Sequence, residues 1–386
     1  MELQEYFKSM VEVEASDLYL TVARPVMFRV DGKIRAAGDH VFSPPELVTL
    51  AQSIMNEKQR REFAETMEMN MATSLPGVAR FRVNIFQQRG SVGMVIRRIK
   101  ADVVSVGELG LPSILNDIVM TKRGLVLVVG ATGSGKSTSL AAMIDYRNSH
   151  EAGHIITIED PIEFVHRHKQ SIITQREVGF DTHSFQAALK NTLRQAPDVI
   201  LIGEIRDTET MEAALTFAET GHLCLGTLHS NNANQAIERI MNFFPIERHA
   251  QFYLQLSLNL RAIVSQRLIP SPDGKRVAAL EILMDTPRIR DLIRKGDVDI
   301  LKEAMEQGIQ EGCQTFDQAL FSLYKAGKIS FEQALINADS TNNLRLKIKL
   351  AGLKVDEEPT QTEKVEGDNG RPEPLQVAGG FRLRKS

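Results

Sequence analysis

A glycine-rich segment at residues 130–137, with the sequence GATGSGKS, carries the clearest chemical signal in the chain. It matches the pattern G-x-x-x-x-G-K-[ST], follows an apolar run at 125–129 and precedes a helical pattern. Glycines let the backbone wrap around a phosphate, and the amides at a helix N-terminus attract its negative charge. Lys136 should reach the β and γ phosphates of a nucleotide, and the Ser137 hydroxyl should bind Mg²⁺. The predicted nucleotide-binding residues here are Gly130, Ala131, Thr132, Gly133, Ser134, Gly135, Lys136, Ser137 and Thr138.

Acidic residues and a histidine follow three other apolar runs. Glu159, Asp160 and Glu163 come after the first run, Glu204 after the second and His229 after the third. Ligands of α/β sheets bind at the carboxyl ends of the strands, so these side chains should face the nucleotide. Hydrolysis of a γ-phosphate needs a held Mg²⁺ and an oriented water, which such groups supply. A single acid after a strand is more often a helix cap or a solvated turn residue, so the prediction depends on their convergence.

A zinc site is an alternative use of part of this region. His222, Cys224 and His229 have the right chemistry, but the alternation of side chains along a strand would turn residue 229 to the opposite face. No fourth ligand is evident either. The chain has only two cysteines, Cys224 and Cys313, which exclude a disulfide framework and a four-cysteine zinc site and favour a reducing compartment.

The elements that must position these residues form an α/β core. Short, unbroken apolar runs at 125–129, 155–158, 199–202 and 223–228 are typical of parallel strands buried on both faces. Helical patterns lie between them, at 184–195 and at 208–219, with Gly221 as the C-terminal cap of the second. This alternation predicts a mostly parallel sheet covered by helices.

Two regions of different character flank the core. The first hundred residues predict a small α+β domain with a strand at 17–22, a hairpin at 26–37 that turns at Asp31-Gly32, one helix from Pro44 to Phe63 and a second hairpin at 79–99. Beyond Pro287 the chain is helical, with capping boxes at Thr315 and Ser330 and a stop at Gly327. The predicted division is an N-terminal domain at 1–100, a linker at 101–112, the core at 113–285, a helical region at 286–354 and a disordered tail at 355–386.

Composition narrows the functions that this chain could have. Its 386 residues carry 46 Lys+Arg against 49 Asp+Glu, a net charge of −3 that argues against a protein coating nucleic acid. The acidic N-terminus does not have the pattern of a signal peptide, and no run of 18 uncharged apolar residues predicts a membrane span. A nucleic-acid motor, with Arg97, Arg98 and Lys100 as phosphate contacts, and a nucleotide-gated assembly subunit with little turnover remain alternative hypotheses.

Four spaced motifs resemble those of the PilT/GspE/VirB11 secretion ATPases. They are the phosphate loop GATGSGKST, the acidic box ITIEDPIEF at 156–164, the Walker B box DVILIGEIRD at 198–207 and the histidine box TGHLCLGTLHS at 220–230. The short N-terminal region and the lack of four cysteines resemble the PilT branch in particular. The resemblance implies a RecA-like core behind a PAS-like N-terminal domain.

The resemblance also implies an activity and roles for residues. The family suggests a hexameric, Mg-dependent ATPase motor for type IV pilus retraction and twitching motility. It would be cytoplasmic, held at the inner membrane by a PilC-like platform protein, with ATP and Mg²⁺ bound and no nucleic acid. Glu163 would activate water, Glu204 would occupy the Walker B position and order Mg²⁺ or water, and His222 and His229 would sense the γ-phosphate. Candidate charge partners are Arg176, Arg194 and Arg206.

One motif departs from the family pattern. The retraction motif A-I-R-N-L-I-R of PilT is changed here at two positions, to Arg288 and Asp291. The change, together with the tail and the segment EFVHRHKQSIITQREVGFD at 163–181, resembles accessory twitching-motility ATPases of the PilT branch. It implies a motor that works alongside a PilT-like ATPase.

Overall fold

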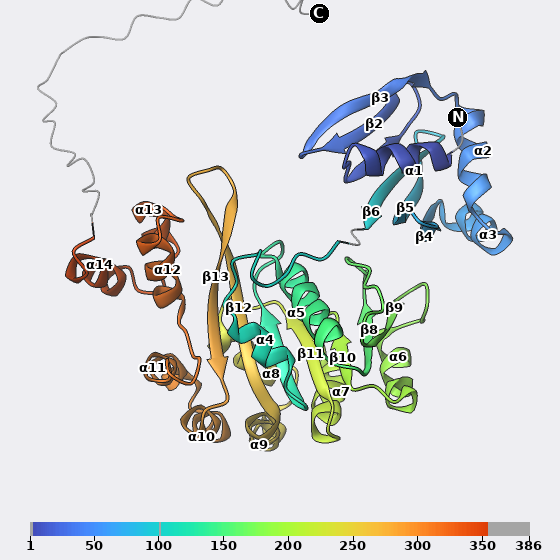
Figure 1. Cartoon of the computed structure of the whole chain (residues 1–386). Helices are drawn as coiled ribbons and strands as arrows, with labels where there is room; N and C mark the ends of the chain where they lie inside the picture. The colour runs from blue at the N-terminus through green and yellow to red at the C-terminus, as the bar shows by residue number, and fades with distance from the viewer. Residues whose placement is uncertain (1–2, 100–101, 354–386) are drawn as a thin grey trace, which may run out of the picture.

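The computed structural model describes residues 3–99 and 102–353, which form an N-terminal domain and a larger core (Figure 1). Six strands of the N-terminal domain form an antiparallel sheet in the order β3-β2-β1-β6-β5-β4. The elements of this domain are α1 (Leu3–Glu12), β1 (Asp17–Leu20), β2 (Pro25–Val30), β3 (Lys33–Val41), α2 (Pro44–Ile54), α3 (Glu57–Thr66), β4 (Glu68–Leu75), β5 (Ala79–Gln88) and β6 (Ser91–Ile99).

One face of this sheet is apolar and the other is polar. On β5, Phe81, Val83 and Ile85 are fully buried in a cluster with side chains of α1 and α2. The alternate residues, which include Arg80 and Arg82, are only partly buried. Because successive side chains of a strand point to opposite faces, both arginines lie on the face away from the helices.

Most of the predicted N-terminal elements are confirmed, with three differences. The Asp31-Gly32 turn is present, and both residues have the positive φ that a tight hairpin turn needs. The single helix predicted from Pro44 to Phe63 is wrong, because Asn56 starts a new helix: its side chain accepts the amide of Gln59, and Gln59 bonds back. Helix α1 and strand β4 have no counterpart in the prediction.

The core contains a seven-stranded sheet in the order β13-β12-β7-β11-β10-β8-β9, parallel except for β13. This confirms the predicted mostly parallel α/β core. Its elements are α4 (Ile114–Val119), β7 (Gly124–Val129), α5 (Lys136–His150), β8 (His154–Glu159), β9 (Ile172–Glu177), α6 (Phe185–Thr192), η1 (Leu193–Gln195), β10 (Val199–Ile202), α7 (Thr208–Glu219), β11 (Leu223–Leu228), α8 (Ala233–Met241), η2 (Ile246–Arg248), α9 (His249–Asn259), β12 (Leu260–Pro270), β13 (Arg276–Met284), α10 (Pro287–Lys295), η3 (Val298–Ile300), α11 (Leu301–Gln307), α12 (Phe316–Lys325), α13 (Phe331–Ile336) and α14 (Thr341–Leu350).

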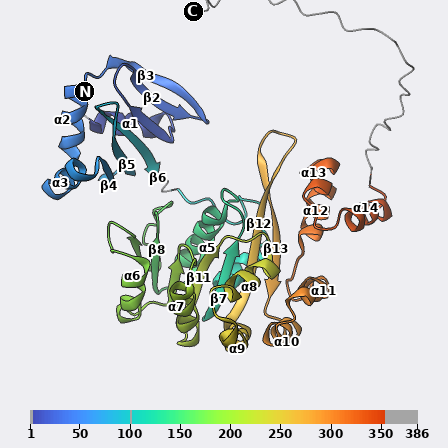
Figure 2. The ribbon, with the colours of Figure 1, turned by 180° about the vertical axis from the view of Figure 1, so that it is seen from behind.

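Helices cover both faces of this sheet, which explains the unbroken apolar strands. On β7, Leu125, Leu127 and Val129 pack with side chains of α6 to α11, whereas Val126 and Val128 pack with α4 and α5. The helices α12, α13 and α14 form a separate cluster against the outer end of β12 and β13. Both flanking layers are visible in Figure 2, where the carboxyl ends of the parallel strands face the N-terminal domain.

The four strands predicted in the core are confirmed, and three were not predicted. Strand β9 is too polar to stand out, and β12 and β13 lie beyond the last predicted strand. The predicted linker at 101–112 overlaps the core, because Val106 and Leu111 are buried among core side chains. The disordered tail predicted at 355–386 lies outside the described residues.

Candidate functional site

The loop between β7 and α5 has the backbone of a phosphate cradle. Gly130 and Gly135 have φ values of +152° and +90°, which residues with a side chain rarely adopt. A Cβ at Gly130 would come within 2.6 Å of the Gln266 carbonyl oxygen, so glycine is required there for packing as well. The loop ends at the first turn of the 15-residue helix α5, whose N-terminal amides favour an anion.

Lys136 and Ser134 are the polar side chains of this loop that could bind an anion. Lys136 is 9% exposed, and its ammonium donates to the carbonyl oxygens of Gly130 at 2.8 Å and Ala131 at 2.9 Å. Burial lowers the pKa of Lys136, while the nearby carboxylates of Glu204 and Glu163 oppose that shift. Among the described residues, the buried Ser134 hydroxyl has no hydrogen-bond partner. A bound anion would give the Ser134 hydroxyl a partner and would compete with the loop carbonyls for the Lys136 ammonium.

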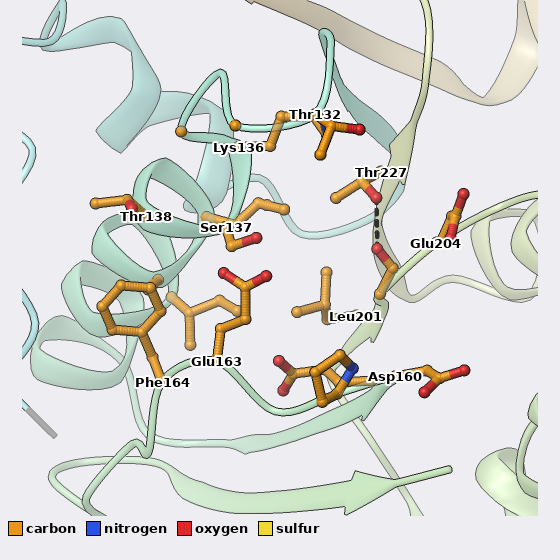
Figure 3. Close-up of a pocket in the computed structure, with 18 of the residues that line it drawn as sticks. Thr132, Lys136, Ser137, Thr138, Asp160, Glu163, Phe164, Leu201, Glu204 and Thr227 are labelled. Carbon is orange, nitrogen blue, oxygen red and sulfur yellow. Dashed lines mark hydrogen bonds between the residues drawn. The ribbon is translucent and has the colours of Figure 1, made fainter. Parts of the chain in front are cut away.

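A cleft of about 490 Å³ joins this loop to the carboxyl ends of β8, β10 and β11. Its polar lining comes from five separate segments of the chain, and residues of four of them are labelled in Figure 3 around one space. The lining includes Thr132, Gly133, Gly135, Lys136, Ser137, Thr138, Glu159, Asp160, Glu163, His166, Glu204, Thr227, His229 and Arg276.

The acids on this cleft have different environments. The exposed Glu163 points its carboxylate toward Ser137 (Figure 3). The Glu204 carboxylate lies 3.4 Å from the His229 ring. Glu159 is partly buried at the end of β8, where desolvation raises its pKa although the Thr157 hydroxyl donates to it at 2.6 Å. The exposed Glu163, the partly buried Glu204 and the partly buried Glu159 thus line the cleft together with His229.

Comparison with known proteins agrees with this geometry. Residues 2–343 match the family model described as "Type II/IV secretion system protein". The chain is 57% identical over 351 residues to the type IV pilus ATPase PilU of Pseudomonas aeruginosa, an alignment that covers 91% of this chain and 92% of that protein. The chain belongs to this secretion ATPase family.

Two further relatives place it in the PilT branch of the family, as the motifs predicted. The type IV pilus retraction ATPase PilT of Pseudomonas aeruginosa is 45% identical over 89% of this chain and 100% of its own length. A crystal structure of the pilus retraction motor PilT with bound ADP is 44% identical and superposes with a TM-score of 0.83, over 90% of this chain and 99% of that one. The predicted family, its PilT branch and the predicted fold are confirmed.

Several predicted site residues of this family member do not reach the cleft within one chain. His222 precedes β11, at the end opposite the phosphate loop, where its ring bonds Thr220 and the Phe217 carbonyl. Six strand residues, about 20 Å, separate it from His229, so the two cannot share a zinc ion. Arg194 lies at the same amino edge, in η1.

Two other predicted arginines lie near the carboxyl edge but do not line the cleft. The Arg206 guanidinium lies over the Phe185 ring, 5.4 Å from its centroid. Arg176 donates to the Asp181 carbonyl oxygen at 3.1 Å. Arg97, offered above as a nucleic-acid contact, pairs with the buried Asp17 at 2.7 Å. Each guanidinium therefore has a partner inside this chain.

Some lining residues were not predicted from the sequence. The Thr227 hydroxyl donates to the Gly203 carbonyl, which ties the ends of β11 and β10 together (Figure 3). Gln266 on β12 accepts the Ser139 hydroxyl at 2.7 Å, and Arg276 on β13 reaches the space beside the loop. Gln266 and Arg276 come from two strands that the sequence did not predict, whereas Thr227 lies on a predicted strand but has no role there that its residue type would mark.

Proposed function

We propose that this chain hydrolyses Mg-ATP in the cleft and drives a type IV pilus motor with the energy. The observation that carries the proposal is the convergence of the loop residues Lys136 and Ser137 with Glu163, Glu204 and His229. These come from four segments that only the fold brings together. Phosphoryl transfer needs this set of a phosphate cradle, a metal-binding hydroxyl and an acid beside the attacking water.

The phosphates would bind to the loop amides and the Lys136 ammonium. That ammonium now bonds its own loop, so it exchanges the carbonyls of Gly130 and Ala131 for phosphate oxygens. Ser134 gains an acceptor for its unpartnered hydroxyl. Arg276, exposed at the rim, is positioned to add a positive charge on the same side.

The donors also fit Mg²⁺, a hard cation that prefers oxygen ligands. Ser137 would hold it with its hydroxyl, and Glu204 would hold it directly or through water. When bound, the ion neutralises charge on the phosphates. Glu163 stays free to accept a proton from water, because its side chain makes no hydrogen bond or ion pair within residues 3–99 and 102–353. His229 orients Glu204 from 3.4 Å.

The role in the cell follows from the relatives. High identity to PilU along nearly the whole of both chains supports a twitching-motility ATPase that acts with a PilT-like ATPase. Such a motor would be a homo-hexamer in the cytoplasm, docked on a PilC-like inner-membrane platform. Within residues 3–99 and 102–353, no helix is long and apolar enough to cross a membrane.

The altered retraction motif supports the accessory role. It forms α10, where Arg288 bonds Gln307 and Glu303 of α11, and Asp291 pairs with Arg294 and Lys295. Both substituted positions therefore belong to ion-pair networks on the surface of the helical region. A partner that reads the alanine and asparagine of the PilT motif would meet a different charge pattern here.

The test of this function is the variant Glu163→Gln. Without the carboxylate, single-turnover hydrolysis should fall about 100-fold or more while ATP binding stays close to that of the unaltered protein. Glu209→Gln, which alters an exposed acid of α7, is the matched control. Hydrolysis at the original rate in Glu163→Gln would assign the base to another residue, and an absence of turnover in the unaltered hexamer, with or without PilT, would refute the ATPase proposal.

A further inference from the structure

An ion pair joins the N-terminal domain to the core beside the cleft. The Arg82 guanidinium of β5 donates to the Glu177 carboxylate of β9 at 2.8 Å, and Arg80 approaches the other oxygen of the same carboxylate at 3.8 Å. Glu177 is only 1% exposed. A carboxylate at that depth needs a positive partner, and the partners it has belong to the other domain.

The same carboxylate touches the segment that carries Glu163. The amide of Ile162 donates to Glu177 in a long hydrogen bond of 3.4 Å. Ile162 is 2% exposed, so its amide has no access to water as an alternative acceptor. Glu177 therefore accepts from Arg82 of the N-terminal domain with one oxygen, and from the backbone one residue before Glu163 with the other.

A second residue of β9 holds this segment on both sides of Glu163. The Gln175 side-chain amide donates to the Phe164 carbonyl at 2.9 Å and to the Glu159 carboxylate at 3.2 Å. Its oxygen accepts the backbone amide of His166 at 2.8 Å. Gln175 and Glu177 point to the same face of β9, because they are two residues apart.

We propose that Gln175 and Glu177 are positioning residues for Glu163, and that Glu177 makes the position of Glu163 depend on docking of the N-terminal domain through Arg82. This inference rests on the proposed function, in which Glu163 accepts a proton from the attacking water. A domain movement that removes Arg82 leaves the buried carboxylate without its closest partner. Glu177 then turns toward solvent, and the amide of Ile162 loses its acceptor.

The two arginines are not equivalent partners of Glu177. Arg80 is too far from the carboxylate for a direct hydrogen bond, and among the described residues its buried Nε has no partner. Only Arg82 donates to Glu177 at hydrogen-bond distance among the described residues of the N-terminal domain. The position of the acidic segment therefore depends on the docking of Arg82.

The first test is Arg82→Ala in the full-length hexamer. Amide hydrogen exchange of a peptide spanning 160–166 should become faster, because Ile162 loses its fixed acceptor. The turnover number should fall about 10- to 100-fold, as expected when a catalytic group moves by about 1 Å, while ATP binding changes less than about threefold. Arg82→Lys, which keeps the charge, should restore part of both effects.

Arg97→Ala is the matched control. Arg97 lies directly across from Arg82 on the neighbouring strand, but it pairs with Asp17 inside the N-terminal domain. Asp17 keeps Arg29 at 3.4 Å as a second partner, so this variant should fold. Exchange at 160–166 and the turnover number should match those of the unaltered protein.

Two further experiments distinguish the contacts of Gln175 with the segment around Glu163 from the docking contact of Arg82 with Glu177. Gln175→Ala should speed exchange at 160–166 whether or not Arg82 is present, whereas Glu177→Gln combined with Arg82→Ala should be no worse than either alone. Unchanged exchange at 160–166 in Arg82→Ala, or an equal change in Arg97→Ala, overturns the proposal. Because exchange does not depend on turnover, this failure is distinct from a failure of the ATPase proposal itself.

Discussion

The two edges of the central sheet use similar residues for different purposes. At the amino edge, polar side chains already have partners: the His154 ring bonds the Gln195 carbonyl and Thr174, and Asp198 accepts the His154 amide. At the carboxyl edge, the Glu163 carboxylate and the Ser134 hydroxyl have no hydrogen-bond partner within residues 3–99 and 102–353. Polar groups at the amino edge therefore stabilise the fold, whereas some polar groups at the carboxyl edge remain available to a ligand.

The physical cause lies in the backbone. Parallel strands end together at the carboxyl edge, where the amino end of α5 presents its amides to the same space. Connections at the amino edge enter strands from helix carboxyl ends, which favour cations or caps instead. A histidine or arginine is therefore part of a site or of a cap according to the end of the strand on which it lies.

Removal of the loop lysine should give the largest effect at the carboxyl edge. In Lys136→Ala the phosphates lose their only charged contact in the loop, so ATP turnover should fall at least about 1000-fold and nucleotide affinity should weaken as well. Steady-state phosphate release and binding of a fluorescent ATP analogue measure both. Lys190→Ala removes an exposed lysine of α6 and should leave both values unchanged.

The two histidines of the histidine box give a direct comparison of the edges. His229→Ala removes the ring beside Glu204, so turnover should fall about 10- to 100-fold. His222→Ala removes a ring that bonds Thr220 at the other edge, and turnover should change less than about threefold. Phosphate release by the purified hexamers measures both variants under the same conditions.

Equal losses in the two histidine variants would contradict this comparison. The result would mean that His222 acts on a nucleotide held by a neighbouring subunit, because His222 does not line the cleft of its own chain. Mixed hexamers decide between the two explanations. His222→Ala subunits that restore activity when combined with Lys136→Ala subunits would place His222 across the boundary.

The sequence predicted the site best where chemistry and local backbone coincide. The phosphate loop was recognisable because two glycines, a lysine and a serine must occur at fixed spacing for the turn itself to form. Glu163, Glu204 and His229 were found because each follows an apolar run, and the parallel sheet turns that order along the chain into proximity in space. His222 was assigned to the nucleotide only by the resemblance, and its place before the strand explains why it lies elsewhere.

What the sequence could not predict depends on pairing between distant strands. Strand β9 has the polar sequence IITQRE, yet it holds the acidic segment through Gln175 and Glu177. The contact of Arg82 with Glu177 joins residues 95 apart in the chain. No local pattern marks such contacts, because each residue on its own has the composition of a solvated surface position.

The smallest predicted effect concerns the stability of the carboxyl edge. His166 closes the acidic segment, and among the described residues its buried Nδ1 has no hydrogen-bond partner. Burial lowers the pKa of this imidazole from 6.5 to about 4. The folded protein therefore keeps the ring neutral where the unfolded chain takes up a proton. Its contribution to stability is complete well above pH 6.5 and is lost as the pH falls toward 4.

The variant His166→Gln removes this titration. Between pH 7.5 and 5.5 the unaltered protein should lose about 1 kcal/mol of unfolding free energy through His166, and the variant should lose that much less. Urea unfolding at the two pH values measures the difference, with His183→Gln as a control at an exposed histidine. An identical pH dependence in all three proteins would mean that the ring finds a partner at this edge. The carboxyl edge would then be as fully satisfied at His166 as the amino edge is at His154.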